Sequence, residues 1–540
     1  MKVFQNHKKF TKFGSEINTS IMKTLRQFWN EKPFQSILII ALVLRLLAAF
    51  FSQGYGMHDD HFLVIEASQS WVDGTDYNNW LPQNQVNPKP EGHSFFYVGI
   101  HFLILSFFKL IGFENPAFKM LLIRLLHAFF SLLIVYYGYK ITEKLSNKKT
   151  AIQVGLLLAV LWFMPFLSVR NLVEVVCIPF LMMGFWILLN APEHKKPNLQ
   201  YLIAGLIMGL AFSVRFQTLI YIGGAGLVLL FEKRWKETFV FAFGALISIF
   251  AIQGVVDMFI WHRPFAELTE YIFYNLKHKD EYGTNNPLMY FEVIMGMLIP
   301  PIGILIFFGF FKEWKKQLML FLPTFLFFLF HTIFTNKQER FGFTMIPFFV
   351  MLGLIGWNNF KDKSTFWQKR PKLLNGFWIF FWVINFVLLP VLTLTFSKKS
   401  RIEAMEYFYK KPVKEILIED TNRSSVYMFP SYYSGQWIRM YALSKEDIKD
   451  STLYAKLKMY HHYFWEIPNK QYFVLHPEAK PEYILFIGDA NLKERVENLK
   501  HVFPNVSFVK EADPGFMDNI LYKLNPVNRN ETIFIYKINY

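Results

Sequence analysis

The residues best suited to chemistry lie in a short stretch that follows the first hydrophobic segment. It reads GMHDDHFLVIE and contains His58, Asp59, Asp60, His61 and Glu66. Two adjacent carboxylates can bind a metal ion, pair with arginines, or take a proton from an attacking hydroxyl. An isolated acidic pair is more often a loop feature that helps to fix membrane topology. The meaning of this pair therefore depends on what the rest of the chain brings to the same place.

The composition is that of a polytopic membrane protein. Of 540 residues, 53% are apolar and 19% aromatic, which is more than one soluble core needs. The formal net charge of +16 comes from Lys and Arg clusters between apolar runs, as expected for cytoplasmic loops. We infer that this charge reflects the membrane topology of the chain, and we predict no nucleic-acid partner. The single cysteine, Cys177, excludes an intrachain disulfide.

Eleven apolar runs are predicted to cross the membrane. They lie near 36–52, 118–139, 150–167, 172–190, 200–214, 216–231, 237–256, 289–311, 317–334, 342–357 and 373–396. A crossing helix needs about 20 residues, so the two short runs near 200–231 are expected to be tilted or broken. With the basic clusters placed inside, the tail 1–35 is cytoplasmic and the C-terminus lies outside. This requires that the apolar run 95–112 does not span. We predict that it lies in the outer interface, within one external loop, 53–117, of a membrane domain that covers 36–397.

Residues 398–540 have a different character, because short apolar runs alternate there with polar segments. Strand-like runs occur at 425–429, 472–476, 483–488, 506–510 and 532–538, and helix-like segments at 444–459 and 491–502. This pattern predicts an external C-terminal α/β domain of a size that folds as a unit. The chain has no nucleotide-cradling glycine motif, so a soluble nucleotide is not expected as a substrate.

Several ionisable residues lie within or at the ends of the apolar runs, where charges are costly and usually face the protein interior or a cavity. In the eleven-helix arrangement, four of them fall near the outer surface at the level of Asp59: Arg170, Glu174, Arg215 and Arg340. Arginine binds phosphate through two parallel hydrogen bonds. Such a site suits a lipid-linked phosphate whose sugar is transferred, with a carboxylate as general base for the acceptor hydroxyl.

These residues resemble the motifs of GT-C membrane glycosyltransferases, specifically glycosyltransferase family 22. Its members are the polyprenyl-phosphate-mannose-dependent mannosyltransferases of N-glycan and GPI-anchor assembly. The family has a His-Pro-Asp-Glu motif, then an aromatic residue and a Glu, in its first external loop; Met57-His58-Asp59-Asp60-His61-Phe62 with Glu66 matches it without gaps. The match puts the family's catalytic Asp on Asp59 and its Glu on Asp60, whereas Met57 and His58 depart from the motif.

A second family block, His-Lys-Glu-x-Arg-Phe followed by a Pro, is similar to Asn336-Lys337-Gln338-Glu339-Arg340-Phe341 with Pro347. The resemblance covers about residues 36–360. It implies inverting transfer of a sugar, mannose in the family, from a polyprenyl-phosphate carrier to a glycan or glycolipid acceptor at the external face of the membrane. It leaves the participation of a divalent metal open, and no other cofactor is expected.

The resemblance and the charge pattern together give each residue an expected role. Asp59 and Asp60 are expected to be catalytic. Four residues are expected to bind the donor phosphate: Arg340, Lys337, Arg215 and Arg170. Six are expected to bind or orient substrate: His61, Glu66, Glu174, Glu339, Gln217 and Tyr282. No residue is assigned as a metal ligand, because an H-x-x-H spacing alone is weak evidence for zinc. Arg170 and Glu174, four apart, equally fit a helical ion pair.

Three alternatives stay open at this stage. A GT-C enzyme of another family, with a different donor sugar or a protein or lipid acceptor, would also have a single Asp after its first helix. A secondary transporter would have a similar number of helices with buried charges. A non-catalytic partner would bind lipid-linked glycans through the same arginines. The Lys-, Asn- and Phe-rich composition favours a bacterial inner membrane with a periplasmic site, or the endoplasmic reticulum with a lumenal site in a eukaryote.

Overall fold

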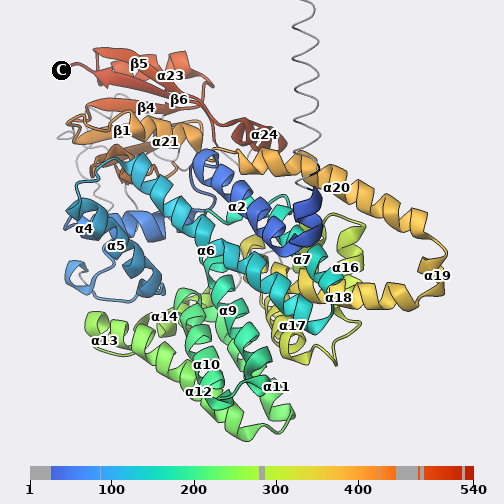
Figure 1. The fold of residues 1–540 in the computed structure, drawn as a ribbon. Coiled ribbons are helices and arrows are strands. Elements are labelled where there is room, and N and C mark those ends of the chain that lie inside the picture. Colours follow the sequence, from blue (N-terminus) through green and yellow to red (C-terminus); the bar gives the residue numbers. More distant parts are fainter. Residues whose placement is uncertain are drawn as a thin grey trace, which may run out of the picture.

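The computed structural model describes residues 26–85, 87–278, 286–424, 426–445, 472–474, 480–525 and 530–540, together with Lys23. Within this part of the chain, a large helical body carries a smaller C-terminal domain built around a sheet (Figure 1). The predicted fold class, a polytopic helical protein with a C-terminal α/β domain, is confirmed.

Helices occupy each of the eleven apolar runs. In chain order they are α2 (Pro33–Phe51), α6 (Pro116–Leu145), α7 (Lys148–Val160), α9 (Val173–Asn190), α10 (Pro197–Val214), α11 (Leu219–Phe231), α12 (Trp235–Ile249), α15 (Met289–Leu298) with α16 (Ile302–Phe310), α17 (Leu318–Ile333), α18 (Ile346–Lys363) and α20 (Pro371–Thr393). Among the described residues, seven helical stretches are long and apolar enough to cross a membrane, so the protein is an integral membrane protein. The count of eleven crossings stays a prediction, because several helices are shorter.

Further helices lie between those of the apolar runs and in the C-terminal domain. They are α3 (His58–His61), η1 (Phe62–Glu66), α4 (Ala67–Val72), η2 (Pro82–Asn84), α5 (Phe95–Leu110), α8 (Met164–Leu167), η3 (Ala191–Glu193), η4 (Phe216–Thr218), η5 (Phe250–Gly254), α13 (Val255–Trp261), α14 (Ala266–Lys277), η6 (Glu339–Met345), α19 (Thr365–Gln368), α21 (Lys399–Glu406), η7 (Ser431–Ser434) and α24 (Phe516–Leu524). The run predicted to lie in the interface forms α5, which exposes Leu103, Phe107 and Leu110.

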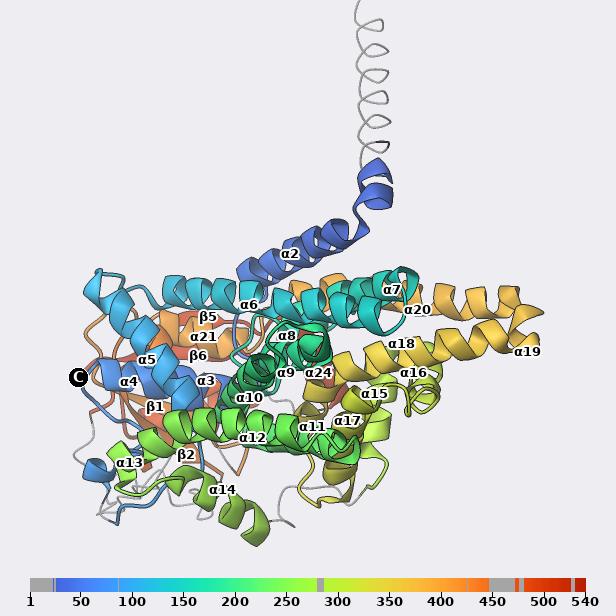
Figure 2. The ribbon, with the colours of Figure 1, turned by 60° about the horizontal axis from the view of Figure 1, so that its bottom comes forward.

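Basic connections lie at the end of the helical body away from the acidic first loop. Lys144 near the end of α6 pairs with Glu193 (Nζ to Oε1, 2.7 Å), and Gln317 before α17 donates to the carbonyl of Leu145. In Figure 1, α4, α5 and the C-terminal domain lie at the upper left, whereas α19 lies at the right and the α11–α12 connection at the bottom. Figure 2 shows α6, α12 and α18 running in nearly the same direction between these ends. Which end faces the cytoplasm stays a prediction.

Glycine permits a very close approach of α16 and α18. A Cβ on Gly309 would lie 2.0 Å from the carbonyl oxygen of Gly353, and one on Gly356 would lie as close to the carbonyl of Gly309. Small residues are the usual contact residues of membrane helices, because dispersion forces drive their packing in lipid. This contact fixes α18, which directly follows η6 and the second family block.

Irregular backbone interrupts the apolar run 150–167 and separates the runs 200–214 and 216–231. After α7, the amide of Asn385 in α20 donates to the carbonyl of Val160 and accepts the N–H of Trp162, both at 2.9 Å. After α10, Arg215 adopts an extended backbone before η4. Irregular backbone at membrane depth is tolerated only where it is buried in protein or lines a cavity. The second interruption turns the buried Arg215 side chain toward α9 and η6.

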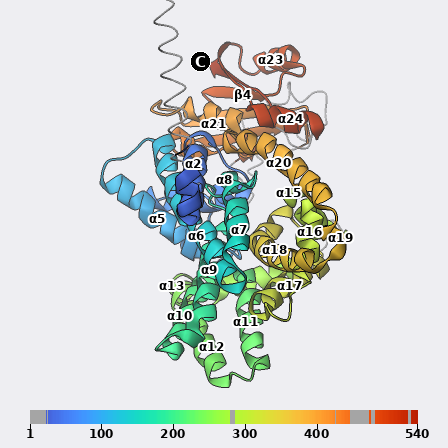
Figure 3. The same cartoon turned by 45° about the vertical axis from the view of Figure 1, so that its right-hand side comes forward.

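The C-terminal domain has a six-stranded sheet in the order β3-β2-β1-β4-β6-β5. The strands are β1 (Glu415–Asp420), β2 (Arg439–Ser444), β3 (Tyr472–Val474), β4 (Tyr483–Ile487), β5 (Val506–Ala512) and β6 (Ile533–Ile538), with α23 (Leu492–Lys500) on one face. Strands β3, β2, β1 and β4 are parallel, and β6 is antiparallel to both of its neighbours. Figure 3 shows α20 running from α19 back toward this domain.

The sheet joins two hydrophobic cores. Leu417 of β1 packs in a cluster with Val496 and Leu499 of α23, whereas Ile416 and Ile418 belong to the main core of the helical body. Successive residues of a strand face opposite sides of a sheet, so one face closes the domain and the other holds it against the helices.

The strand predictions for this domain were partly wrong. The four later strand-like runs contain β3, β4, β5 and β6, but residues 426–429 are irregular and the two strands β1 and β2 were missed. The strand β1 reads EILIED, in which acidic residues flank a short apolar run and hide the strand pattern. Glu419 is nevertheless buried, because it pairs with Arg495 of α23 (Nε to Oε2, 2.7 Å). Most of the predicted helix 444–459 lies outside the described residues.

Candidate active site

Asp59 lies in α3, on the connection that follows α2. Its Oδ2 is 2.6 Å from Nη1 of Arg340 in η6, and its side chain is 36% exposed. Burial acts to raise the pKa of Asp59, but the charge of Arg340, aided by His93, lowers that pKa below its usual value. The carboxylate is therefore ionised at neutral pH while part of it stays accessible, as a general base requires.

Asp60 differs from Asp59 in its surroundings. It is 3% exposed, and its two oxygens accept the backbone N–H groups of Gly56 (3.0 Å) and Met57 (3.2 Å). Burial raises the pKa of Asp60 to about 6, against the charge of Arg170 and these hydrogen bonds. Both oxygens are thus engaged in fixing the turn that presents Asp59.

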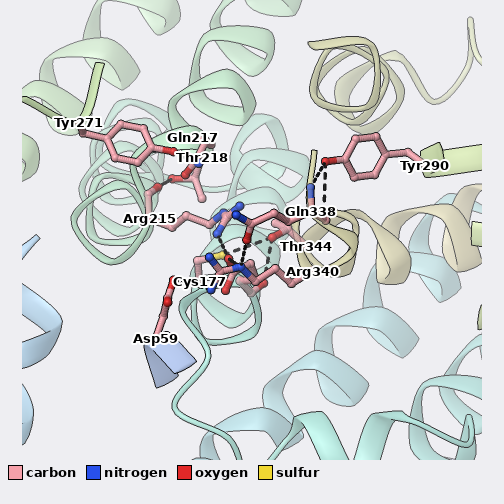
Figure 4. A network of polar contacts seen from close by, with 11 residues as sticks. Asp59, Cys177, Arg215, Gln217, Thr218, Tyr271, Tyr290, Gln338, Arg340 and Thr344 are labelled. Carbon is pink, nitrogen blue, oxygen red and sulfur yellow. Dashed lines mark hydrogen bonds and ion pairs between the residues drawn. The ribbon is translucent and has the colours of Figure 1, made fainter. Parts of the chain in front are cut away.

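Glu174, in the first turn of α9, holds the two arginines together. Its Oε1 forms an ion pair with Nη1 of Arg215 and lies 3.7 Å from Nε of Arg340, which also donates to Gln338 (2.7 Å). Figure 4 shows Arg215 and Arg340 side by side, with Asp59 next to Arg340. The structure thus brings together Asp59, Glu174, Arg215 and Arg340, whereas Arg170, which the sequence placed at the same level, lies apart from them. The alternative Arg170–Glu174 helical pair is not formed.

Arg215 has unused hydrogen-bonding capacity. Its Nε and Nη2 are buried and have no hydrogen-bond partner among the described residues, and neither has Oε2 of Glu174. Its guanidinium lies over the ring of Phe341, 5.0 Å from the centroid. Buried polar groups without partners are rare in native proteins and call for an explanation. Donors left open on a cation fit an anionic ligand.

Arg170 and Lys337 have different surroundings. Arg170 donates to the carbonyls of Ser52 (2.7 Å) and Gly54 (3.0 Å) and lies over the ring of Phe166, so it is engaged at the end of α2. Lys337 is 6% exposed, and its ammonium has no ion pair or hydrogen bond within the residues that the structure describes. Of the two, Lys337 has the side chain free to bind phosphate.

His61 and Glu66 connect the first loop to the C-terminal domain. Nε2 of His61 is 3.3 Å from Oε1 of Glu66, which accepts the backbone N–H of Tyr432 (3.0 Å). The His61 ring stacks on Tyr55 (4.9 Å between centroids) and on Tyr433 (5.4 Å). These contacts give both residues a positioning role, because they fasten η7 to the segment that carries Asp59.

The remaining three predicted residues have different positions relative to the arginine pair. Gln217 in η4 donates to the hydroxyl of Tyr271, at the rim of the arginine pair (Figure 4). Glu339 is exposed, and its neighbour Gln338 contacts Arg340 instead. Tyr282 lies outside the described residues.

Sequence reasoning missed several residues at the site. Thr344 donates to the carbonyl of Glu174 (2.9 Å), and Tyr290 shares two hydrogen bonds with the backbone of Gln338. His93 lies near enough to Asp59 to influence its pKa, and the carboxylate of Glu267 in α14 accepts its backbone N–H. None of them belongs to a motif or a charged apolar run, so no sequence signal marks them.

The two histidines of the H-x-x-H spacing have separate partners. His58 stacks on Phe62 (4.5 Å between centroids), while His61 is engaged with Glu66 and two tyrosines. Across the described part of the chain, no group of three or more His, Cys, Asp or Glu residues is arranged to hold a metal ion.

Solved structures share this arrangement of helices and C-terminal domain. The protein resembles ArnT from Cupriavidus metallidurans bound to undecaprenyl phosphate, with a TM-score of 0.59 and 12% identity, over 93% of this chain and 97% of that one. Its apo form gives a TM-score of 0.57 at the same identity and coverage. The Archaeoglobus fulgidus oligosaccharyltransferase is more distant, with a TM-score of 0.47 and 11% identity over 86% and 69% of the two chains. No curated protein sequence matches significantly.

A family model and the fold together make the protein a membrane glycosyltransferase of the GT-C class. The model of the Alg9-like mannosyltransferase family matches residues 36–437, which is most of the chain. This protein belongs to that family. The family model spans both motif blocks, the helical body and the first part of the C-terminal domain, and the membership sets the transporter alternative aside.

Proposed function

We propose that the protein transfers a sugar, mannose by family, from a polyprenyl-phosphate carrier to a glycan or glycolipid acceptor on the external face of the membrane, with Asp59 as the general base. The observation that carries this proposal is the arrangement of Asp59 beside Arg340, which Glu174 joins to Arg215. It combines an ionised, accessible carboxylate with a pair of cations.

The donor phosphate has a natural place at these cations. Arg215 has two donor groups without partners among the described residues, and Lys337 lies in the same block as Arg340. Guanidinium groups bind phosphate oxygens in a fork that lysine cannot reproduce. The bound undecaprenyl phosphate of the ArnT structure, which shares this fold, supports a lipid-linked phosphate as the ligand.

The reaction then needs one proton transfer and one displacement. Asp59 accepts the proton of the acceptor hydroxyl as its oxygen bonds to the anomeric carbon, and the bond from that carbon to the phosphate oxygen breaks. The electron pair of the broken bond leaves with the polyprenyl phosphate, whose new charge Arg340 and Arg215 stabilise. Attack from the face opposite the leaving group inverts the anomeric centre. Phosphate leaves without protonation, so no second acid is required.

Donor binding would also make Asp59 a stronger base. In the structure, Arg340 is paired with Asp59, and a phosphate that competes for Arg340 would release that carboxylate. Burial acts to raise the pKa of Asp59 and the charge of Arg340 to lower it, so loss of the pair makes Asp59 a stronger base. The two substrates are thereby coupled, because the base becomes effective when the donor is in place.

Transfer from a panel of polyprenyl-phosphate sugars tests the proposal. Purified protein in lipid is incubated with radiolabelled mannosyl, glucosyl, galactosyl and aminoarabinosyl donors and a membrane glycan extract. We expect transfer from the mannosyl donor, and loss of both transfer and donor binding in Arg340→Gln. Transfer from another donor would show that the sugar is not mannose, and the proposed reaction would stand. Transfer that survives in Arg340→Gln with unchanged donor affinity would contradict the phosphate site.

A further inference from the structure

A polar cavity lies between the first long connection, the start of α6 and the C-terminal domain. Its volume is about 420 Å³, and its lining includes Gln69, Lys109, Lys119, Tyr409, Gln436 and Trp437. None of the residues proposed to hold the donor phosphate lines it. The cavity is thus separate from the arginine pair.

Lys119 is the notable residue of this cavity. It is 7% exposed, and its ammonium donates to Oε1 of Gln69 (3.2 Å). Among the described residues, no carboxylate lies within 4.0 Å of that ammonium. A lysine ammonium has three donors, and a buried charge needs close partners. Asp73 and Glu114 act on Lys119 only from beyond that distance. An anionic ligand would supply the direct partner.

The rest of the lining suits a sugar that carries a negative charge. Four lysines, Lys109, Lys119, Lys410 and Lys411, face two acids, Asp73 and Glu114. Asp73 is engaged already, because Lys109 lies 3.7 Å from it and Trp437 donates its indole N–H to it (3.0 Å). Aromatic rings and amide side chains supply the apolar faces and directional hydrogen bonds that small polar ligands need.

The cavity is connected to the segment that carries Asp59. Tyr432, which lines it, donates its backbone N–H to Glu66, and Gln69 belongs to α4, which follows η1 without a break. Arg340 contacts Asp59 from η6, and Arg215 is joined to Arg340 through Glu174 of α9. The cavity, in contrast, is built by α4, the start of α6 and the C-terminal domain. Its position therefore fits the second substrate of a transferase, the acceptor.

We propose that this cavity binds an anionic group, a carboxylate or a phosphate, of the acceptor saccharide, with Lys119 as its main ligand. The proposal rests on the proposed transferase function. A phospholipid headgroup offers the same chemistry, because α5 next to the cavity exposes apolar residues such as Leu110. The test must therefore separate a saccharide from a lipid, and this cavity from the donor site.

Calorimetric titration of the full chain in phosphatidylcholine nanodiscs makes both distinctions. The probe is glucose 6-phosphate, with uncharged glucose as reference. We expect saturable binding of the phosphate sugar, at least tenfold weaker binding by Lys119→Gln, binding near wild type by Lys119→Arg, and no change in Arg340→Gln. Since binding is measured without turnover, the result does not depend on whether Asp59 is the base.

Three outcomes would overturn the assignment. The first is equal affinity of wild type and Lys119→Gln. The second is loss of binding in Arg340→Gln but not in Lys119→Gln, which would place the anion at the donor site. The third is loss of glucose 6-phosphate binding when phosphatidylglycerol is added to the nanodiscs, which would make the occupant a lipid headgroup. If Lys119→Gln does not fold, Lys410→Gln on the exposed rim replaces it, with an expected severalfold loss of affinity.

Discussion

At the scale of residues, the two adjacent aspartates have distinct environments. Asp59 is half-buried and paired with a cation, whereas Asp60 is buried and accepts two backbone N–H groups. Their sequence positions do not separate these roles, because neighbouring residues of one turn differ only in the direction of their side chains. The structure thereby favours Asp59 as the base and gives Asp60 the task of holding the turn.

The pH dependence of transfer should report the influence of Arg340 on Asp59. Transfer needs the ionised carboxylate, so kcat/KM for the donor falls as pH drops through the pKa of Asp59 in the free enzyme. Arg340 keeps that pKa below its usual value, so the acid limb of wild type lies below the range of an ordinary aspartate. In Arg340→Gln, which is not expected to bind donor, the pKa of Asp59 is followed by NMR of its carboxyl carbon. This pKa should rise, because the largest cationic contribution is lost. An unchanged pKa would show that Arg340 does not set the charge state of Asp59.

Substitution of Asp60 should have a smaller effect than substitution of Asp59. Asn offers one acceptor oxygen where Asp60 uses two, so one backbone N–H loses its partner, at a cost of about 1–3 kcal/mol. We expect Asp60→Asn to reduce kcat by about tenfold, because a looser turn misplaces Asp59 and a loss of about 1.4 kcal/mol in transition-state stabilisation is a factor of ten. Steady-state kinetics decide the point, and a loss equal to that of Asp59→Asn would make Asp60 part of the chemistry.

The charged residues in apolar runs predicted which side chains form the centre of the site, but the partner of each charge was not predictable. Arg215, Glu174 and Arg340 meet because helix ends at one level converge. Arg170 satisfies the same sequence criterion, yet it binds backbone carbonyls at the end of α2. A pattern reveals that a buried charge needs a partner; it does not reveal whether the partner is a carboxylate, a ligand or the backbone.

At the scale of elements, close helix contacts hold η6 in place. α16 and α18 meet at Gly309 and Gly353, so Gly309→Ala should push these helices apart. We expect a loss of about 1–3 kcal/mol, as for other overpacked cores, measured as a lower unfolding temperature in detergent. Gly223→Ala in α11 is the matched control, because a Cβ there meets nothing within 4 Å. Equal stability of both variants would contradict the close contact.

The contact between the first loop and the C-terminal domain also depends on few groups. Glu66 is fully buried and accepts both from His61 and from the backbone of Tyr432. Glu66→Ala leaves that N–H without a partner, which should lower the free energy of unfolding by about 1–3 kcal/mol. Limited proteolysis should then cut between the helical body and the domain faster than in the control Glu494→Gln, an exposed site on α23. Equal cleavage rates would argue against this link.

Elements with strong periodicity were predictable, and those shaped by tertiary contacts were not. The apolar runs fixed the positions of the long helices, since length and hydropathy are sufficient for them. Strand β1 was missed because its acids are neutralised by residues far along the chain, such as Arg495. The break after α7 was likewise hidden, because the distant Asn385 stabilises it. The break after α10 was predictable, because Arg215 divides the two short runs 200–214 and 216–231.

At the scale of the whole molecule, the acidic first loop, the arginine pair and the C-terminal domain come together at one end. The sheet contributes Ile416 and Ile418 to the core of the helical body, so the domain packs firmly on the helices that carry the site. If both proposals hold, a lipid-linked donor is bound between helices by the arginines, and an anionic acceptor is bound between loop and domain. Asp59 lies on the segment shared by the two.

The most direct test of this account is the single-turnover rate of sugar transfer by Asp59→Asn, measured beside wild type and the exposed control Glu494→Gln. Binding of the polyprenyl-phosphate donor is measured in parallel. We predict that Asp59→Asn binds donor at least as well as wild type, because Arg340 is freed, while its rate of transfer falls by about 10²–10⁴, the usual contribution of a general base. Full transfer activity in Asp59→Asn would show that Asp59 is not the general base.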